Sequence, residues 1–219
     1  MSRGLGDVYK RQTLGTNSFN SGAFSTITGA YSIASGNYEG GNNTAAASKN
    51  FGATITGSLN SIESATASSG YSGVANSIVG TANRTFNSNG SLIFGAGNEI
   101  TNSVKNISAP TDGGASAKDL ADTLRSAVRN SESGGATLAI GGGNKADYTQ
   151  KTSIIGVNNT VTGTSRRPST YNSITGFKNA AANVNHVSVI GSENEIENTD
   201  DALVLGNKHK LAGANGSVI

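Results

Sequence analysis

The sequence contains no cysteine and no tryptophan, and only two of its 219 residues are proline. Without cysteine the chain can form neither a disulfide framework nor a thiolate metal site. Aromatic residues make up 5% and charged residues 14%, against about 25% charged residues in ordinary domains. Because bulky and charged side chains are both scarce, we expect a regular, closely stacked backbone rather than a thick hydrophobic core.

Long hydrophobic runs are also missing. No apolar run approaches the roughly 18 to 20 residues that a membrane helix needs, and the N-terminus has no signal-peptide core. The formal net charge is only +2, and we expect no nucleic-acid partner. If the protein is exported, we expect the beginning of its precursor to be missing from this sequence.

Glycine, in contrast, is abundant, and 30 glycines punctuate a repeated phrase. In the C-terminal part, each phrase has small polar residues, then two or three apolar residues and a glycine. These glycines are Gly141, Gly156, Gly176, Gly191 and Gly206, spaced fifteen residues apart except for one interval of twenty. A repeat of this kind indicates a solenoid, in which each repeat forms one coil.

Nearer the N-terminus, Gly22, Gly29 and Gly36 lie seven residues apart. At about 3.3 Å per residue, seven residues fit one short strand and one bend, so two halves make a coil of about 14 to 15 residues. Small polar and apolar residues alternate within each half, which is typical of strands and not of helices. The sequence therefore predicts an all-β solenoid.

Alignment of the coils on their glycines produces columns of similar residues. Three residues after the glycine stands a polar column, and we expect its amides to form a ladder along the stack. Its members are Asn98, Asn144, Asn159, Asn179, Asn194 and His209. Five residues after the glycine, an apolar column predicts the buried face of a second strand. Its members are Ile100, Ala146, Val161, Ala181, Ile196 and Leu211.

The strand that leads into each glycine is apolar on both faces. In the coil of Gly156, Ile154 lies two positions before the glycine and Ile155 one position before it. Adjacent strand residues point to opposite faces, so a solenoid can bury only one of these columns. We expect further copies of the chain to cover the other, around a rotational axis parallel to the stack. A ligand groove along that face of a monomer is the alternative.

The stretch Gly29-Ala-Tyr-Ser32-Ile-Ala34-Ser-Gly36 resembles the G-x-x-S-x-A-x-G repeat of the YadA-like head of trimeric autotransporter adhesins. Val187-Ser-Val-Ile-Gly191 is similar to the S-V-A-I-G phrase of these heads. The resemblance implies a left-handed parallel β-roll whose homotrimer forms an adhesive head on a Gram-negative cell surface. It also implies binding to host matrix or cell-surface ligands, or autoagglutination, with outer-membrane attachment only through a C-terminal anchor missing here.

The presence or absence of the phrase divides the chain into four segments. We expect residues 1–12 to be a non-native leader, because they lack the phrase and resemble translated adapter sequence; a native basic arm is the alternative. Residues 13–100 and 137–219 are expected to form coils, with the second set truncated before its next glycine. Residues 101–136, which include Pro110, are an insertion.

The insertion contains a helical pattern. Apolar residues recur at helical spacing in 116–130, and Ser116 and Asp119 are arranged like a capping box in which aspartate replaces glutamate. Gly134 and Gly135 follow its expected end. We predict an amphipathic helix near 116–130 that folds against the roll as a structural cover. A partner-binding role for this helix is the alternative.

A second, shorter insertion at 164–170 contains Pro168 and interrupts a coil. It carries Arg166 and Arg167, and Tyr171 follows directly. A basic loop beside an aromatic residue, projecting from a weakly charged rod, is suited to gripping a receptor or an anionic glycan. We therefore take Arg166, Arg167 and Tyr171 as candidate ligand contacts. A solvated loop tip is the alternative.

Catalytic patterns are not found in the sequence. His186 and His209 lie 23 residues apart, without metal-ligand spacing. The Gly95-Ala-Gly97 stretch lacks the third glycine and the following helix of a dinucleotide motif. We therefore predict a protein that is not an enzyme and that has no cofactor and no metal site.

Two other classes of solenoid remain as alternatives to an adhesin. An ice-binding solenoid needs stacked columns of Thr-x-Thr, whereas the pairs at 26–28, 54–56 and 160–162 are expected to be scattered. A phage fibre or carbohydrate-active solenoid needs acidic or aromatic residues clustered along one groove. With six tyrosines, six phenylalanines and no tryptophan, the chain is poor in residues for a sugar-stacking cleft.

Overall fold

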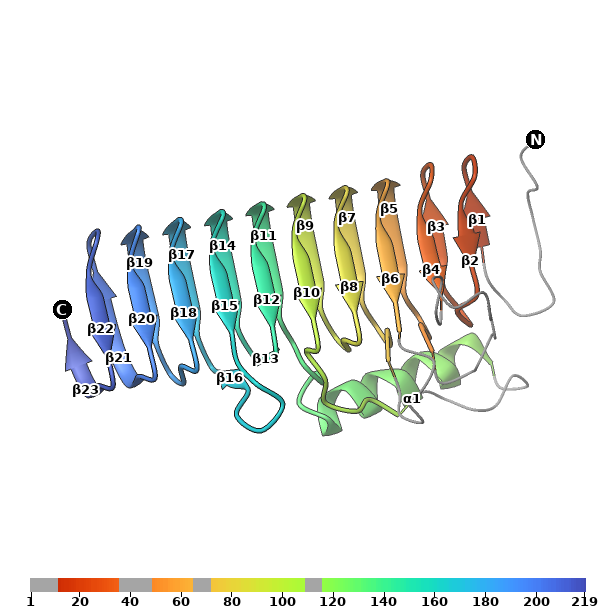
Figure 1. Cartoon of the computed structure of the whole chain (residues 1–219). Coiled ribbons are helices and arrows are strands. Elements are labelled where there is room, and N and C mark those ends of the chain that lie inside the picture. The colour runs from red at the N-terminus through yellow and green to blue at the C-terminus, as the bar shows by residue number, and fades with distance from the viewer. Residues whose placement is uncertain (1–11, 36–48, 65–71, 109–115) are drawn as a thin grey trace.

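The computed structural model describes residues 12–35, 49–64, 72–108 and 116–219. Within these residues the chain forms two long parallel sheets that run side by side, with one helix beside them (Figure 1). Each coil except the last contributes one strand to each of these two sheets, so the strand order follows the chain. The predicted all-β solenoid with one inserted helix is confirmed. Of the expected leader, only Gln12 is described, and it is the first residue of a strand.

The described residues build an eleven-stranded sheet, a ten-stranded sheet and a two-stranded sheet. The eleven-stranded "long sheet" contains β1 (Gln12–Leu14), β3 (Thr26–Thr28), β5 (Thr54–Ser58), β7 (Ser77–Thr81), β9 (Leu92–Ala96), β11 (Leu138–Gly142), β14 (Ser153–Val157), β17 (Ser173–Phe177), β19 (Ser188–Ser192), β21 (Asp200–Leu205) and β23 (Asn215–Val218). The ten-stranded "second sheet" contains β2 (Phe19–Asn20), β4 (Ile33–Ser35), β6 (Ser61–Glu63), β8 (Arg84–Phe86), β10 (Glu99–Thr101), β12 (Lys145–Asp147), β15 (Thr160–Thr162), β18 (Ala180–Ala182), β20 (Glu195–Glu197) and β22 (Lys210–Ala212). The strands β13 (Thr149–Gln150) and β16 (Ser169–Thr170) form the two-stranded sheet.

The C-terminal coils have three sides, because β13 and β16 form a short third side that continues through the bridges of Asn185. The sides meet at corners where residues with positive φ turn the chain. The first corner lies two residues after the glycine, as at Asn158; the second lies seven residues after it, as at Tyr148. The third lies five residues before the next glycine, as at Lys151. The second corner is therefore the one opposite the long sheet.

The glycines of the phrase form a column in the long sheet, with each glycine paired to the glycine of the next coil. Their φ angles are positive, for example +126° at Gly156 and +132° at Gly176. A Cβ atom on Gly156 would lie 2.0 Å from the carbonyl oxygen of Gly176. Both the backbone conformation and the spacing of the coils therefore require glycine here.

The asparagine ladder is present, and it is longer than the sequence predicted. The backbone N–H and Nδ2 of Asn159 both donate to Oδ1 of Asn144 at 3.0 Å, and Nδ2 also donates to the Gly176 carbonyl at 2.8 Å. The same bonds join the neighbouring coils. In the N-terminal coils, the column that lies three residues after the glycine continues through Ser18, Ser32, Asn60 and Asn83. This ladder satisfies amides that are buried inside the roll.

The core of the roll consists of two facing aliphatic columns. One comes from residues two positions before the glycine in the long sheet, such as Ile154 and Ile174. The other is the column that the sequence predicted for the second sheet, five residues after the glycine. This column is buried except for the half-buried Leu211, and its member in the coil of Gly80 is Thr85. No aromatic ring belongs to this central core among the described residues, in agreement with the low aromatic content.

The helix α1 (Ala117–Asn130) is close to the predicted span, and Ser116 is its N-cap. The Ser116 hydroxyl accepts from the Asp119 N–H at 3.2 Å and donates to the Asp119 carboxylate at 2.6 Å. The shorter aspartate thus bonds the cap hydroxyl, whereas a glutamate in a capping box bonds the cap N–H. The insertion leaves the roll continuous, because β9 pairs with β11 and β10 with β12.

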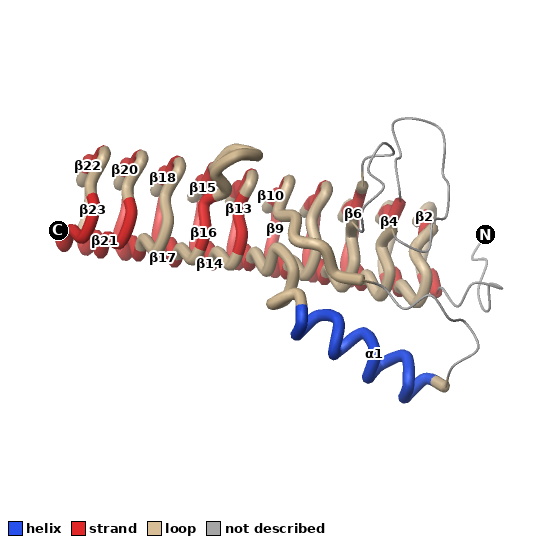
Figure 2. The backbone as a smooth tube through the Cα atoms, turned by 90° about the horizontal axis from the view of Figure 1, so that it is seen from below, coloured by secondary structure: helices blue, strands red, loops and turns tan. Residues whose placement is uncertain are grey.

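The helix lies along the N-terminal coils, at their third corner (Figure 2). Although none of its residues is fully buried, Leu124, Ala127 and Val128 pack on a cluster formed by Phe51, Val74 and Ile107. At this corner the coils carry the small residues Gly52, Ala75 and Gly90, and a Cβ on Gly90 would lie 2.1 Å from the Ser133 carbonyl oxygen. The small corner residues therefore allow the helical segment to approach.

The glycine column provides a first test. Gly156→Ala should lower the free energy of unfolding by about 3 kcal/mol or more, because it adds backbone strain of order 1–3 kcal/mol to a clash with the next coil. The matched control is Gly97→Ala, whose φ is +65° and whose new Cβ would meet nothing closer than 3.9 Å. Denaturant unfolding measures both. Equal losses in the two variants would contradict the proposed contact.

Candidate binding surface

The loop at 163–168 joins β15 to β16 and projects from the second corner (Figure 1). Within it, the Thr164 N–H donates to the Arg167 carbonyl at 2.9 Å, and the Arg167 N–H donates to the Thr164 hydroxyl at 3.0 Å. At its base, the Gly163 N–H donates to the Asp147 carbonyl at 2.8 Å. The loop is therefore held by its own bonds and by the neighbouring coil.

Arg167, one of the three candidate contacts, fastens this loop to a later coil. Its Nη2 lies 3.0 Å from both carboxylate oxygens of Asp200. Nδ2 of Asn185 donates to the same carboxylate at 2.9 Å. The Asn185 amide first, and then the Arg167 guanidinium, hold the pKa of Asp200 below its ordinary value. Arg166 is exposed and has no ion-pair partner among the described residues. Of the two arginines, Arg166 is thus the one whose charge stays available to a ligand.

Tyr171 lies on the third corner, in a row of exposed side chains that follows the roll axis. Its ring stacks on His186 of the next coil, with centroids 4.8 Å apart and planes 2° apart. On the side of the preceding coil, Nζ of Lys151 lies 4.8 Å from the ring centroid and donates to the Tyr171 hydroxyl at 2.9 Å. His186 therefore covers one face of the ring, whereas Lys151 lies beside the hydroxyl. Tyr171 stays 50% exposed, so a ligand could reach the ring edge and part of the other face. No contact joins Tyr171 to either arginine within the described residues.

Glu132, just beyond the helix, links the inserted segment to the roll. Its carboxylate accepts from Nζ of Lys151 and from Nζ of Lys105, the latter at 3.0 Å. The two ammonium groups, Lys151 first, lower the pKa of Glu132 from 4.5 to about 2. Sequence reasoning missed this link, because its three members come from separate segments.

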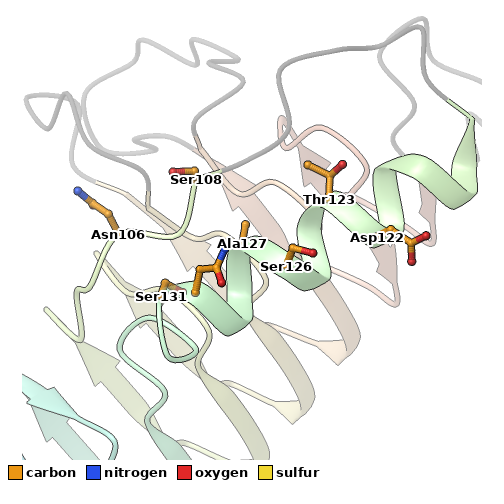
Figure 3. A pocket seen from close by; sticks show the side chains of 8 residues that line it. Asn106, Ser108, Asp122, Thr123, Ser126, Ala127 and Ser131 are labelled. Carbon is orange, nitrogen blue, oxygen red and sulfur yellow. The ribbon is translucent and has the colours of Figure 1, made fainter.

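A groove of about 670 Å³ lies between α1 and residues 106–108 (Figure 3). Its lining is polar apart from Ala127, and the Asp122 carboxylate is already paired with Arg125. The lining residues are Asn106, Ser108, Asp122, Thr123, Ser126, Ala127, Asn130 and Ser131. Because the described residues of this groove include no large apolar anchor, they give little support to a partner-binding role for the helix.

The outer face of the long sheet carries the second apolar column that the sequence predicted. One residue before the glycine, Phe94 and Ile190 are each 56% exposed and Leu205 is 49% exposed. Val157 and Phe177, one position after the glycine, extend this surface, as does Leu92, three positions before it. Sequence reasoning missed these three, although period-two alternation places them on the same face.

The same face is more polar in the N-terminal coils, where two Thr-x-Thr pairs lie side by side. Thr26 pairs with Thr54 and Thr28 with Thr56, so the expectation that these pairs are scattered was wrong for β3 and β5. The next strand, β7, carries Ser77 and Val79 at these positions, and the third Thr-x-Thr pair lies in β15 of the second sheet. The threonine columns therefore end after two coils.

In the described part of the chain, no group of three histidine, aspartate or glutamate side chains could hold a metal ion. Among the same residues, no helix is long and apolar enough to cross a membrane. Compared with models of known protein families and with curated proteins, the chain matches none. The surfaces described above are therefore the features of the chain that bear on its function.

Single mutations can distinguish the role of Arg167 from that of Arg166. Arg167→Ala should lower the free energy of unfolding by about 0.5 to 1 kcal/mol, the range for partly exposed ion pairs, because it releases the loop from Asp200. Arg166→Ala should leave stability unchanged. Chemical denaturation, together with protease cleavage at 163–168, measures both effects. A loss in Arg166→Ala as large as in Arg167→Ala would contradict the assignment.

The link at Glu132 predicts a pH dependence. Because its folded pKa of about 2 lies below the ordinary value of 4.5, the link is complete above pH 4.5 and is lost as the pH falls toward 2. Hydrogen-exchange protection of α1, corrected for intrinsic rates, should therefore fall between pH 5 and pH 2. Glu132→Gln should remove this difference. The same pH response in both proteins would show that another carboxylate controls the helix.

Proposed function

We propose that this chain is the head domain of a trimeric autotransporter adhesin, exposed on the surface of a Gram-negative bacterium. In this proposal three copies pack through the outer faces of their long sheets, around an axis parallel to the roll. The observation that carries the proposal is the apolar outer face, which one roll cannot bury. Its large exposed members are Leu14, Leu92, Phe94, Ile155, Val157, Phe177, Ile190, Leu205 and Val218.

The energetics favour coverage of this face. Full burial of such side chains contributes about 1.5 to 3 kcal/mol each, so covering half-exposed ones contributes about 1 kcal/mol each. Exposed apolar surfaces of this extent mark interaction sites in soluble proteins. Another copy of the same chain is the simplest partner for this face, because the outer face of that copy is apolar as well and would be buried in the same contact.

The resemblance to YadA-like heads supplies the number of copies and the class of protein. In the stretch that carries it, Ser32 belongs to the hydrogen-bonded ladder and Ala34 to the core, so both motif residues have structural roles. A parallel trimer would present three identical surfaces to host matrix, host cells or other bacteria. Weak contacts at each surface would then add through avidity. Arg166 and the Tyr171 ring edge remain candidate contacts for such a ligand.

The mass of the chain in solution tests the assembly. Sedimentation equilibrium should give a trimer, and Ile155→Lys combined with Ile190→Lys should shift the mass toward the monomer, because two charges would enter each interface. The control is Ala182→Lys, which places a charge beside Glu197 on the second sheet and should leave the trimer intact. A folded wild-type monomer at high concentration would count against the proposal, as would equal masses for all three proteins.

A further inference from the structure

A groove of about 330 Å³ lies at the second corner, beside the loop at 163–168. Asn87, Asn102 and Tyr148, the corner residues of three successive coils, line its length. Ser165 and Pro168 of the loop line it at one end. Its volume is within the range of about 300 to 1,000 Å³ that is usual for small-ligand sites.

Several polar atoms of this lining are held in place but have no partner among the described residues. Gln150 donates through Nε2 to the Val104 carbonyl at 3.0 Å, and Asn102 donates through Nδ2 to Asp147 at 2.8 Å. Their amide oxygens remain free to accept. The hydroxyls of Tyr148 and Ser165 are also unbonded, and the hydroxyl of the lining residue Ser72 is buried without a partner.

The wall of the groove is fixed before any ligand arrives. The loop is closed by the Thr164 and Arg167 bonds and fastened to Asp200, and its Pro168 has a restricted backbone. Across the base of the loop, the Ser169 N–H donates to the Tyr148 carbonyl at 3.0 Å. A preformed site of this kind loses little conformational entropy on binding.

The lining chemistry defines the ligand. The described residues of the lining include no charged side chain, so they favour neither an anion nor a cation. Fixed amide oxygens accept from hydroxyl groups, free hydroxyls both donate and accept, and Tyr148, Val104 and Pro168 offer apolar contact.

We infer that this groove binds a neutral saccharide unit of a surface glycan. The inference gives a ligand class to the adhesive head and rests on that proposed function for its biological role. The second corner is opposite the long sheet, so assembly through the outer face leaves the groove open. Binding by an isolated chain therefore does not depend on the trimer.

The test uses the whole chain on an array of immobilised oligosaccharides that end in neutral hexoses or N-acetylhexosamines, with sialylated counterparts. Wild type should be retained on at least one neutral glycan, and Tyr148→Ala should bind it at least tenfold more weakly. The control is Tyr31→Ala, another exposed corner tyrosine with positive φ, which lies outside the groove and should bind like wild type. Circular dichroism verifies that each variant is folded.

Three results would overturn the inference: no retention of folded wild type on any glycan, retention only on sialylated glycans, or equal loss in both tyrosine variants. Cell adhesion without glycan retention would contradict saccharide binding by the groove but would agree with the proposed adhesive head. Glycan retention by a protein that stays monomeric would support the groove and contradict the trimer.

Discussion

The contact between glycines of successive coils is the constraint on which the rest of this roll depends. An added Cβ on any glycine from Gly29 to Gly191 in this column would lie 1.7 to 2.0 Å from the next glycine's carbonyl oxygen. The coils can stack at their observed spacing only if these positions stay in register. Once they do, the ladder of Asn144 and Asn159, three residues further along the chain, is aligned as well. The register that brings the glycines into contact therefore also allows the buried asparagine side chains to form their hydrogen bonds.

Register also explains why the protein has an apolar outer face. Residues two positions before the glycine fill the core, and the period of two places those one position before it outside. Ile154 is fully buried while its neighbour Ile155 is 40% exposed. Stability of a single roll requires only the inner column, so the aliphatic residues of the outer column need a different explanation. Assembly through the long sheet provides one.

Features set by local spacing could be predicted from the sequence. The coil period, the two aliphatic columns and most of the ladder follow from counting residues from each glycine, and α1 follows from helical periodicity and its Ser116 cap. Ser18 and Ser32 fit the same count but were missed because they are not asparagines. The corners were missed because residues as different as Tyr171, His186 and Asp201 share one positive-φ position. The Arg167–Asp200 pair could not be predicted, since 33 residues separate its members and loop geometry alone brings them together.

The two insertions affect different corners, and this separation bears on function. The helical segment covers the third corner of the N-terminal coils, where Gly52, Ala75 and Gly90 leave room for it. The loop at 163–168 projects from the second corner, which does not border the long sheet. A regular stack presents nearly the same surface in every coil and so distinguishes ligands poorly. The loop ends this regularity and closes one end of a groove whose free polar atoms are fixed in position. Assembly and recognition can therefore use opposite sides of one roll, and a change to either surface leaves the glycine column intact.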